Sequence, residues 1–203
     1  MTTKRVQWIL ASASPRRQEI LRGLGLAFEV HPSTSPEPGI RPGENPISYA
    51  VRAARAKARE VGQEHDAGLV VSADTIVVRG RRLMGKPESR RDAEGMLRLL
   101  SGAWHKVVTG VCLHDCRTRV QRSSHAVSGV HFRRLSASEM AWYLDTGEYR
   151  DKAGAYAIQG YASLFIDRIE GCYFNIVGFP VFTFDRLCSK MGIELIRELT
   201  VNS

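Results

Sequence analysis

The sequence has few cysteines, no long apolar run and fewer acidic than basic residues. Its four cysteines in 203 residues are too few for the dense disulfide framework of a small secreted protein. Cys112 and Cys116 lie four residues apart, but no second Cys/His pair follows at zinc spacing, so buried or incidental thiols are favoured over a zinc site. No apolar run approaches the roughly 18 residues that cross a bilayer, and no secretory leader is visible. We therefore expect a cytoplasmic protein without a membrane partner.

Several catalytic signatures are also missing. There is no Gly-x-Ser-x-Gly elbow, which removes the usual nucleophile of a Ser/His/acid hydrolase. Gly23-Leu24-Gly25 lacks the rest of a dinucleotide fingerprint, and no Walker-type Gly-Lys-Ser/Thr loop occurs. Aromatic residues are not interleaved with the basic ones, and no nucleic-acid reading module is recognisable. Binding to nucleic acid is therefore not favoured.

The net charge of +8 nevertheless suggests an anionic partner. The conspicuous basic groups are Arg79/Arg81/Arg82, Arg90/Arg91 and Arg133/Arg134. Each group is also compatible with a solvated, solubilising surface. A small polyanion bound in a cleft explains the charge with fewer assumptions than a nucleic acid does.

The chain has the composition of a folded domain. Its 43% hydrophobic residues can form a full core, and no linker, repeat or low-complexity tract divides it, so we expect a single domain over residues 1–203. Strands are predicted at 6–10, 69–73, 76–78, 107–113, 127–132, 164–169 and 173–177, and helices at 14–24, 47–61, 89–100, from 136 onward and at 181–191. This alternation predicts an α/β fold with a mixed, twisted sheet and flanking helices.

The first candidate site is the segment Ser12-Ala13-Ser14-Pro15-Arg16-Arg17, where a predicted strand runs directly into a helix. Free backbone N–H groups and the helix dipole favour an anion at such a helix N-terminus. Ser12 and Ser14 add hydroxyl groups, and Arg16 and Arg17 can grip phosphate oxygens. An ordinary N-cap with surface arginines is the alternative.

The second candidate is Asp74, which stands between two apolar strand-forming runs. An aspartate is normally kept out of a sheet interior unless it is paired or binds something. We expect Asp74 at a strand end, projecting into a ligand crevice; a turn aspartate that caps backbone amides is the alternative. Glu37 is a possible second carboxylate, and Lys57 and Lys86 are possible phosphate ligands. Taken singly, each of these three is also compatible with an ordinary surface residue.

The third candidate is the segment from Asp151 to Gly160, in which Asp, Lys and Gln alternate with small residues. A core segment has no need of this mixture, so it is more typical of a wall that touches a polar ligand. His105, after Trp104, is compatible with ligand contact or with a hydrogen-bonded structural histidine near a strand start.

Together these segments resemble one known family. The motifs that carry the resemblance are residues 10–21, Ala73-Asp74-Thr75-Ile76-Val77, Gly85-Lys86-Pro87, Leu100-Ser101-Gly102 with His105 and Thr109-Gly110-Val111, residues 151–160, and Asn175-Ile176-Val177-Gly178-Phe179-Pro180. In this order and over nearly the whole chain they resemble the Maf family of nucleoside triphosphate pyrophosphatases. Arg17, Thr75 and Gln159 match the branch that acts on dTTP and UTP, whereas the 7-methyl-GTP branch differs around Gln159.

The resemblance implies hydrolysis of a nucleoside triphosphate between the α- and β-phosphates, with help from a divalent cation, Mg²⁺ or Mn²⁺. It implies a two-lobed α/β fold around a central cleft, related to that of the inosine triphosphatases, and a homodimer. Asp74 matches the family's general base, and Asp74 with Glu37 would hold the cation, although the surroundings of Glu37 depart from the family pattern. The residues expected at phosphate or base are Ser12, Ser14, Arg16, Arg17, Lys57, Thr75, Lys86 and Gln159, with Lys86 also counted as catalytic.

The chain departs from the family pattern at two positions, and two alternative functions remain open. Ser72 and Ala157 stand where the family commonly has glycine, changes that can tighten the pocket. A nucleotide-sensing or nucleic-acid-binding regulator of cell division without turnover is an alternative of another class, because the family is linked to septum formation. A purine-directed pyrophosphatase is the alternative within the enzyme class.

Overall fold

The computed structural model describes residues 6–36 and 38–200. Its seven strands form one mixed sheet in the order β2-β1-β3-β5-β6-β7, with β4 paired to β3. The strands are β1 (Trp8–Leu10), β2 (Glu29–Val30), β3 (Leu69–Arg79), β4 (Arg82–Met84), β5 (Trp104–Asp115), β6 (Gln121–Phe132) and β7 (Ile166–Glu170). The α-helices are α1 (Pro15–Gly23), α2 (Pro46–Gln63), α3 (Arg90–Leu100), α4 (Ala137–Asp145), α5 (Tyr173–Val177) and α6 (Val181–Lys190). The predicted mixed α/β class is confirmed.

The chain divides into two compact units. The first comprises the residues up to Asp74, residues 109–126 and those from Gly178 onward, and the second comprises residues 75–108 and 127–177. Strands β3, β5 and β6 each contribute residues to both units. That the whole chain acts as one domain stays a prediction.

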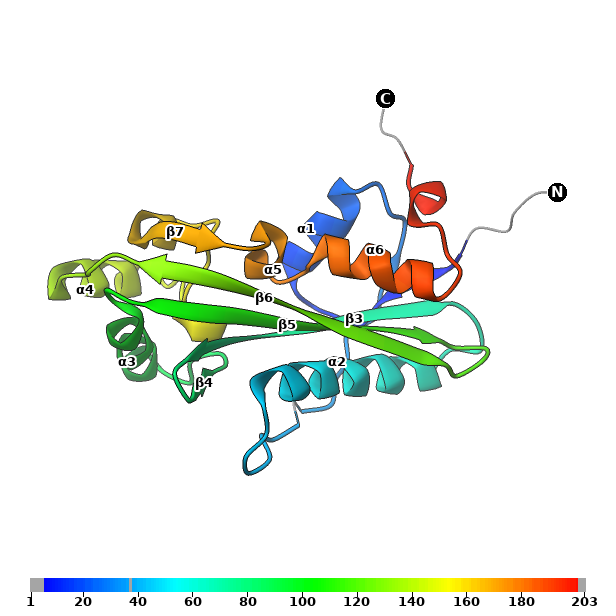
Figure 1. The fold of residues 1–203 in the computed structure, drawn as a ribbon, viewed down its shortest axis with the longest axis horizontal. Coiled ribbons are helices and arrows are strands. Elements are labelled where there is room, and N and C mark those ends of the chain that lie inside the picture. Colours follow the sequence, from blue (N-terminus) through cyan, green and yellow to red (C-terminus); the bar gives the residue numbers. More distant parts are fainter. Residues whose placement is uncertain (1–5, 37, 201–203) are drawn as a thin grey trace. The chain divides into compact units, whose positions relative to one another are not determined.

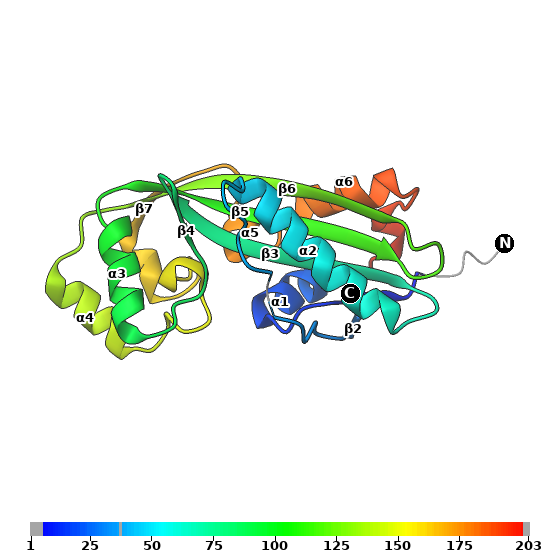
Figure 2. The ribbon, with the colours of Figure 1, turned by 90° about the horizontal axis from the view of Figure 1, so that it is seen from below.

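The first unit has helices on both faces of its part of the sheet (Figures 1 and 2). Successive strand residues point to opposite faces, and the two buried clusters follow this alternation. One cluster joins Trp8, Leu10, Leu69, Val71, Val111 and Leu113 with Leu21 of α1 and Phe184 and Leu187 of α6. The other joins Ile9, Ala11, Val70 and Cys112 with Ala54, Ala58 and Val61 of α2. Helix α2 therefore covers one face of these strands, and helices α1 and α6 cover the other face.

Helix α2 lies unusually close to β5 because both carry small residues where they meet. Ala50, Ala53, Ala54 and Ala58 of α2 are fully buried. A Cβ atom added at Gly110 of β5 would lie 2.3 Å from the carbonyl oxygen of Ala50, which no side chain tolerates. Gly110 thus sets the depth at which α2 rests on the sheet.

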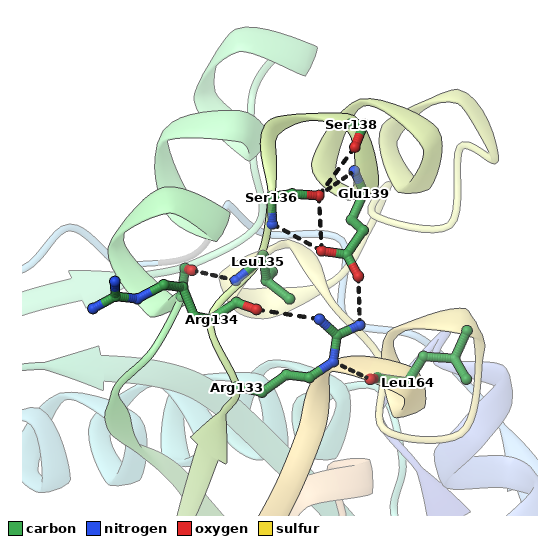
Figure 3. Close-up of polar contacts among 8 residues, drawn as sticks. Arg133, Arg134, Leu135, Ser136, Ser138, Glu139 and Leu164 are labelled. Carbon is green, nitrogen blue, oxygen red and sulfur yellow. Dashed lines mark hydrogen bonds and ion pairs between the residues drawn. The ribbon is translucent and has the colours of Figure 1, made fainter.

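The second unit has its own core, in which α3 packs against α4 and against the 3₁₀ helix Ala153–Ala155. The helix predicted at 89–100 is confirmed as α3, and its buried face consists of Ala93, Met96, Leu97 and Leu100. Helix α4 begins with a capping box, in which the Ser136 hydroxyl accepts from the Glu139 N–H and the Glu139 carboxylate accepts from the Ser136 N–H (Figure 3).

Arg133, from the basic pair Arg133/Arg134, contacts this helix cap. Arg133 donates to Glu139 at 2.7 Å and to the carbonyl of Leu164 at 3.0 Å (Figure 3). The Arg133 guanidinium therefore has a structural role in joining the start of α4 to the segment before β7.

Two strand predictions near the C-terminus need correction. The strand predicted at 164–169 begins at Ile166, after a 3₁₀ helix over Tyr161–Phe165. The strand predicted at 173–177 is wrong, because Tyr173–Val177 forms α5. The Asn175 amide in α5 is fully buried and donates to the carbonyl of Val107 and to the Ser128 hydroxyl. These tertiary hydrogen bonds outweigh the strand preference of the Tyr, Phe, Ile and Val side chains.

The prediction of buried thiols is confirmed for three of the four cysteines. All four are free thiols, with Cys112, Cys116 and Cys188 buried and Cys172 partly buried. Burial raises the pKa of the Cys112 thiol to about 12, which keeps it in the unreactive protonated form. Within residues 6–36 and 38–200, no helix combines the length and apolar character needed to span a membrane.

The contact at Gly110 is tested by Gly110→Ala. The added methyl group meets the α2 backbone, so we expect the free energy of unfolding to fall by about 2–3 kcal/mol, measured by urea denaturation. Gly95→Ala in α3 is the matched control, because nothing lies within 4 Å of its added Cβ and alanine favours a helix. Equal stability of Gly110→Ala and the unaltered protein would contradict the close approach.

Candidate functional site

The predicted site residues fall into two sets, one in each unit. Ser12, Ser14, Arg16, Arg17, Lys57 and Asp74 belong to the first unit, and Thr75, Lys86 and Gln159 belong to the second. Glu37 lies outside the described residues.

In the first unit, Lys57 and Asp74 form a buried ion pair. The Lys57 Nζ donates to Asp74 Oδ1 at 2.6 Å, and the two side chains are only 16% and 4% exposed. Asp74 lies two and four residues after Ser72 and Val70 on β3, so the period of a strand directs it to the face that α2 covers. The close packing of α2 on this face brings Lys57 within reach.

The predicted position of Asp74 at a strand end is wrong. Strand β3 runs without a break from Leu69 to Arg79, and Asp74 stands in its middle. The strands predicted at 69–73 and 76–78 are therefore one strand. Pairing with the Lys57 ammonium compensates the buried carboxylate, which lets the strand continue through an acidic residue.

The residue before Asp74 on the same face also joins β3 to α2. The Ser72 hydroxyl is fully buried and donates to the carbonyl oxygen of Ala54 at 2.6 Å. A glycine at this position would have no side chain to make this bond. Ser72 thus links β3 to α2 one turn before Lys57.

The turn between β1 and α1 has the form expected from the sequence. Pro15 is the first residue of α1 and Ser14 is its N-cap, and the Ser14 side chain makes no capping bond in the described part of the chain. Arg17 donates from Nη1 to the Ser12 hydroxyl and from Nε to the carbonyl of Gly178, both at 3.0 Å. The guanidinium of Arg17 is thereby fixed beside the first turn of α1, where anions are favoured.

The strand register places this turn and Asp74 at the same end of the sheet in the first unit. Strands β1 and β3 are parallel, with Leu10 opposite Val71, and the Ala11 N–H donates to the Val71 carbonyl at 2.8 Å. Both Ser12 and Asp74 follow these paired residues in the chain. The end of β1 and the buried carboxylate of β3 therefore lie on the carboxyl side of the pairing.

In the second unit, the segments that carry Lys86 and Gln159 are joined. The Gly154 N–H donates to the carbonyl of Gly85 at 3.0 Å, directly before Lys86. The side chains of Lys86 and Gln159 are exposed and that of Thr75 is partly buried. The segment before Gln159 and the segment of Gly85 thus meet next to the exposed ammonium group of Lys86.

His105 is a structural histidine, one of the two predicted alternatives. It is the second residue of β5, is 3% exposed, and its Nε2 lies 2.8 Å from the Tyr156 hydroxyl. Burial lowers the pKa of His105 to about 4, so the ring is neutral at pH 7.

Sequence reasoning missed two anchors on α2 that hold the loop over residues 31–45. Glu60 accepts from the Ser33 hydroxyl at 2.6 Å, from the Thr34 N–H at 2.8 Å and from the Ser35 N–H at 3.0 Å. Arg52 donates to Glu44 and to the carbonyl of Gly39. The only sequence signal for these anchors is a run of small hydroxyl residues followed by a charged helix. This pattern is too common to be specific.

These anchors matter because of what the loop carries. Glu37 lies between the segment held by Glu60 and the segment held by Arg52. Lys57 is on the same helix, between Arg52 and Glu60. One helix therefore supplies the partner of Asp74 and the attachments on both sides of Glu37.

The donor set allows a test of the divalent cation that the resemblance implies. No group of three or more His, Cys, Asp or Glu side chains suited to a metal occurs within residues 6–36 and 38–200. Mg²⁺ is commonly held by one or two carboxylates together with substrate phosphates and water. Asp74 can therefore contribute one carboxylate to a cation whose remaining ligands include substrate phosphates and water.

Comparison with known proteins agrees with the motifs. The profile described as Maf-like protein matches residues 7–191, and the chain belongs to the Maf family. A protein of Syntrophomonas wolfei is 43% identical over 188 residues, covering 93% of this chain and 99% of its own. A protein of Alkaliphilus oremlandii is 45% identical over 197 residues, covering 97% and 98%. Both relatives are named dTTP/UTP pyrophosphatase.

The loop anchor is tested by Glu60→Gln. Loss of the carboxylate weakens four hydrogen bonds from residues 33–35, so we expect the free energy of unfolding to fall by about 1 kcal/mol and protease cleavage within 31–45 to become faster. Glu94→Gln is the control, because Glu94 makes an exposed i,i+4 pair with Arg98 of little energetic value. Equal cleavage rates in both variants would contradict the anchor.

The same anchor predicts a pH dependence. Burial raises the pKa of Glu60, but hydrogen bonds from Ser33, Thr34 and Ser35 outweigh it and lower the pKa from 4.5 to about 2. A depressed pKa in the folded state gives stability that is complete above pH 4.5 and is lost as the pH falls toward 2. The difference in melting temperature between the unaltered protein and Glu60→Gln should stay constant at higher pH and shrink across that window. A difference that grows on acidification would contradict the assignment.

Proposed function

We propose that this chain hydrolyses dTTP and UTP between the α- and β-phosphates, releasing the nucleoside monophosphate and pyrophosphate. Membership of the Maf family and relatives named dTTP/UTP pyrophosphatase over 93–97% of the chain support the proposal. The observation that carries it is the buried Asp74 carboxylate held by Lys57 in the unit that also contains the Ser12–Arg17 turn. Such an arrangement provides a proton acceptor and a polyanion-binding turn in one compact unit.

Asp74 is the general base in this proposal. Phosphoryl and nucleotidyl transfer require positioning and charge neutralisation more than covalent chemistry. The hydrogen bond from Lys57 holds the carboxylate in one orientation, as a base that must accept a proton from water requires. Lys57 would thus orient Asp74, and its ammonium would also offset the charge of the phosphates.

The other residues divide the substrate between them. Ser12, Ser14, Arg16 and Arg17 would bind phosphate oxygens at the start of α1, and Lys86 would neutralise the triphosphate and assist catalysis. Thr75 and Gln159 would contact the nucleobase. The carboxamide of Gln159 has both the donor and the acceptor that the edge of uracil or thymine needs. The two-lobed arrangement around a central cleft stays a prediction from the family resemblance.

A divalent cation, Mg²⁺ or Mn²⁺, would be held by Asp74 together with Glu37. When bound, it would polarise the phosphoryl group and offset the charge of the triphosphate. A cytoplasmic location, favoured by the free thiols, and a homodimer are part of the same proposal.

The activity is tested with purified protein, Mg²⁺ or Mn²⁺ and a panel of nucleoside triphosphates. We expect pyrophosphate release to be fastest with dTTP and UTP, to stop when EDTA removes the cation, and to return when the cation is restored. Release of orthophosphate would contradict the proposed bond. A preference for purine nucleotides would favour the purine-directed alternative, and nucleic-acid binding without turnover would favour the regulatory one.

The base is tested by Asp74→Asn. The carboxamide keeps the shape of the side chain and an oxygen that accepts from Lys57, but it cannot take up a proton. We expect kcat to fall by about 100-fold or more, while circular dichroism shows a folded protein at the assay temperature. Asp66→Asn, at an exposed position of the first unit, should keep full activity. An active Asp74→Asn variant would rule out the proposed base.

A further inference from the structure

Gln159 belongs to a segment of the second unit that is attached at several points. On its N-terminal side, the Gly154 N–H donates to the carbonyl of Gly85. Gly154 has φ of +69°, and an added Cβ would lie 2.8 Å from Cγ2 of Val77 on β3. A side chain at this position would therefore push the segment away from β3.

The next attachment is the side chain of Tyr156. Its ring is buried and meets Phe132 edge to face, with centroids 4.9 Å apart. Its hydroxyl lies 2.8 Å from Nε2 of His105. One residue earlier, the carbonyl of Ala155 accepts from the Tyr143 hydroxyl at 3.2 Å.

On the C-terminal side of Gln159, the segment is held by Glu148. This carboxylate accepts from the N–H of Tyr161 at 2.7 Å and from the N–H of Ala162 at 3.2 Å. A Cβ at Gly160 would lie only 2.1 Å from Glu148 Oε2. Gln159 is thus an exposed residue on a short span between two fixed points, Tyr156 and Tyr161.

His105 is the partner that ties this span to the sheet. It stands on β5, packs edge to face against Phe132 at 5.1 Å and against Tyr156 at 5.4 Å, and hydrogen-bonds the Tyr156 hydroxyl. At 3% exposure, its ring acts on the exposed residues through Tyr156.

We propose that His105 and Tyr156 are positioning residues for nucleotide selection. Their hydrogen bond holds the backbone before Gln159, and through Gly154 and Gly85 it holds the segment of Lys86. The inference rests on the proposed function, because it assigns Gln159 and Lys86 to the nucleotide. The Tyr156 hydroxyl therefore sets how well the chain distinguishes uracil and thymine from other bases.

The test compares Tyr156→Phe, His105→Phe and the double variant with the unaltered protein. Each change removes the hydrogen bond and keeps an aromatic ring. We expect each single variant to raise KM for UTP about fivefold, the effect of one lost hydrogen bond, and to lower kcat by a smaller factor. The kcat/KM ratio of UTP to CTP should fall similarly, and the double variant should lose no more than either single one.

Tyr149→Phe is the matched control, because Tyr149 is a buried tyrosine of the same core that contacts Arg150 and lies outside the segment 154–162. It should keep the KM and the UTP/CTP ratio of the unaltered protein. If either positioning variant lowers the melting temperature but leaves both quantities unchanged, the role is structural only and the inference is overturned. If the unaltered protein releases no pyrophosphate, the proposed function fails and this inference fails with it.

Discussion

The proposed chemistry of this chain depends on one ion pair, between Lys57 of α2 and Asp74 of β3. A carboxylate with 4% of its side chain exposed is expensive to leave without a counter-charge. The Lys57 ammonium supplies that charge and fixes the orientation of the carboxylate. The same contact therefore supports both the continuity of β3 and the placement of the proposed base.

The ion pair in turn depends on small residues at the interface of α2 and the sheet. Buried alanines on α2 and Gly110 on β5 bring the helix backbone close to the strands, and the Ser72 hydroxyl ties the two elements together. A larger side chain at this interface would move the backbone of α2 at Lys57 away from the strand that carries Asp74. The helix also holds Ser33 through Glu60 and Gly39 through Arg52.

Much of this organisation could be predicted from the sequence, because it is local or motif-based. The proline at the start of α1, the apolar face of α3 and the capping box of α4 follow from residue type and spacing, and the linked motifs identified the family. What could not be predicted depends on partners distant in the chain. Asp74 was expected to end a strand because its partner Lys57, 17 residues earlier on a helix, is invisible to a local pattern.

Two further residues illustrate the same limit. Asn175 sits in a helix and not in a strand because its amide binds Val107 and Ser128, 68 and 47 residues away. For His105 the sequence favours a structural histidine but leaves ligand contact open, and the choice is decided by Tyr156, 51 residues later in the chain. In each case the side chain is polar and buried, so its role is decided by the group that satisfies it.

The most direct test of the ion pair is a double-mutant cycle of unfolding free energies with Lys57→Met and Asp74→Asn. Lys57→Met alone leaves a buried carboxylate without its counter-charge, so it should cost about 3 kcal/mol or more. Adding Asp74→Asn to that variant removes the stranded charge and should restore part of the stability, although Asp74→Asn by itself destabilises the unaltered protein. If Asp74→Asn instead destabilises both backgrounds equally, within about 0.5 kcal/mol, the two residues are not coupled and the proposed placement of the base is wrong.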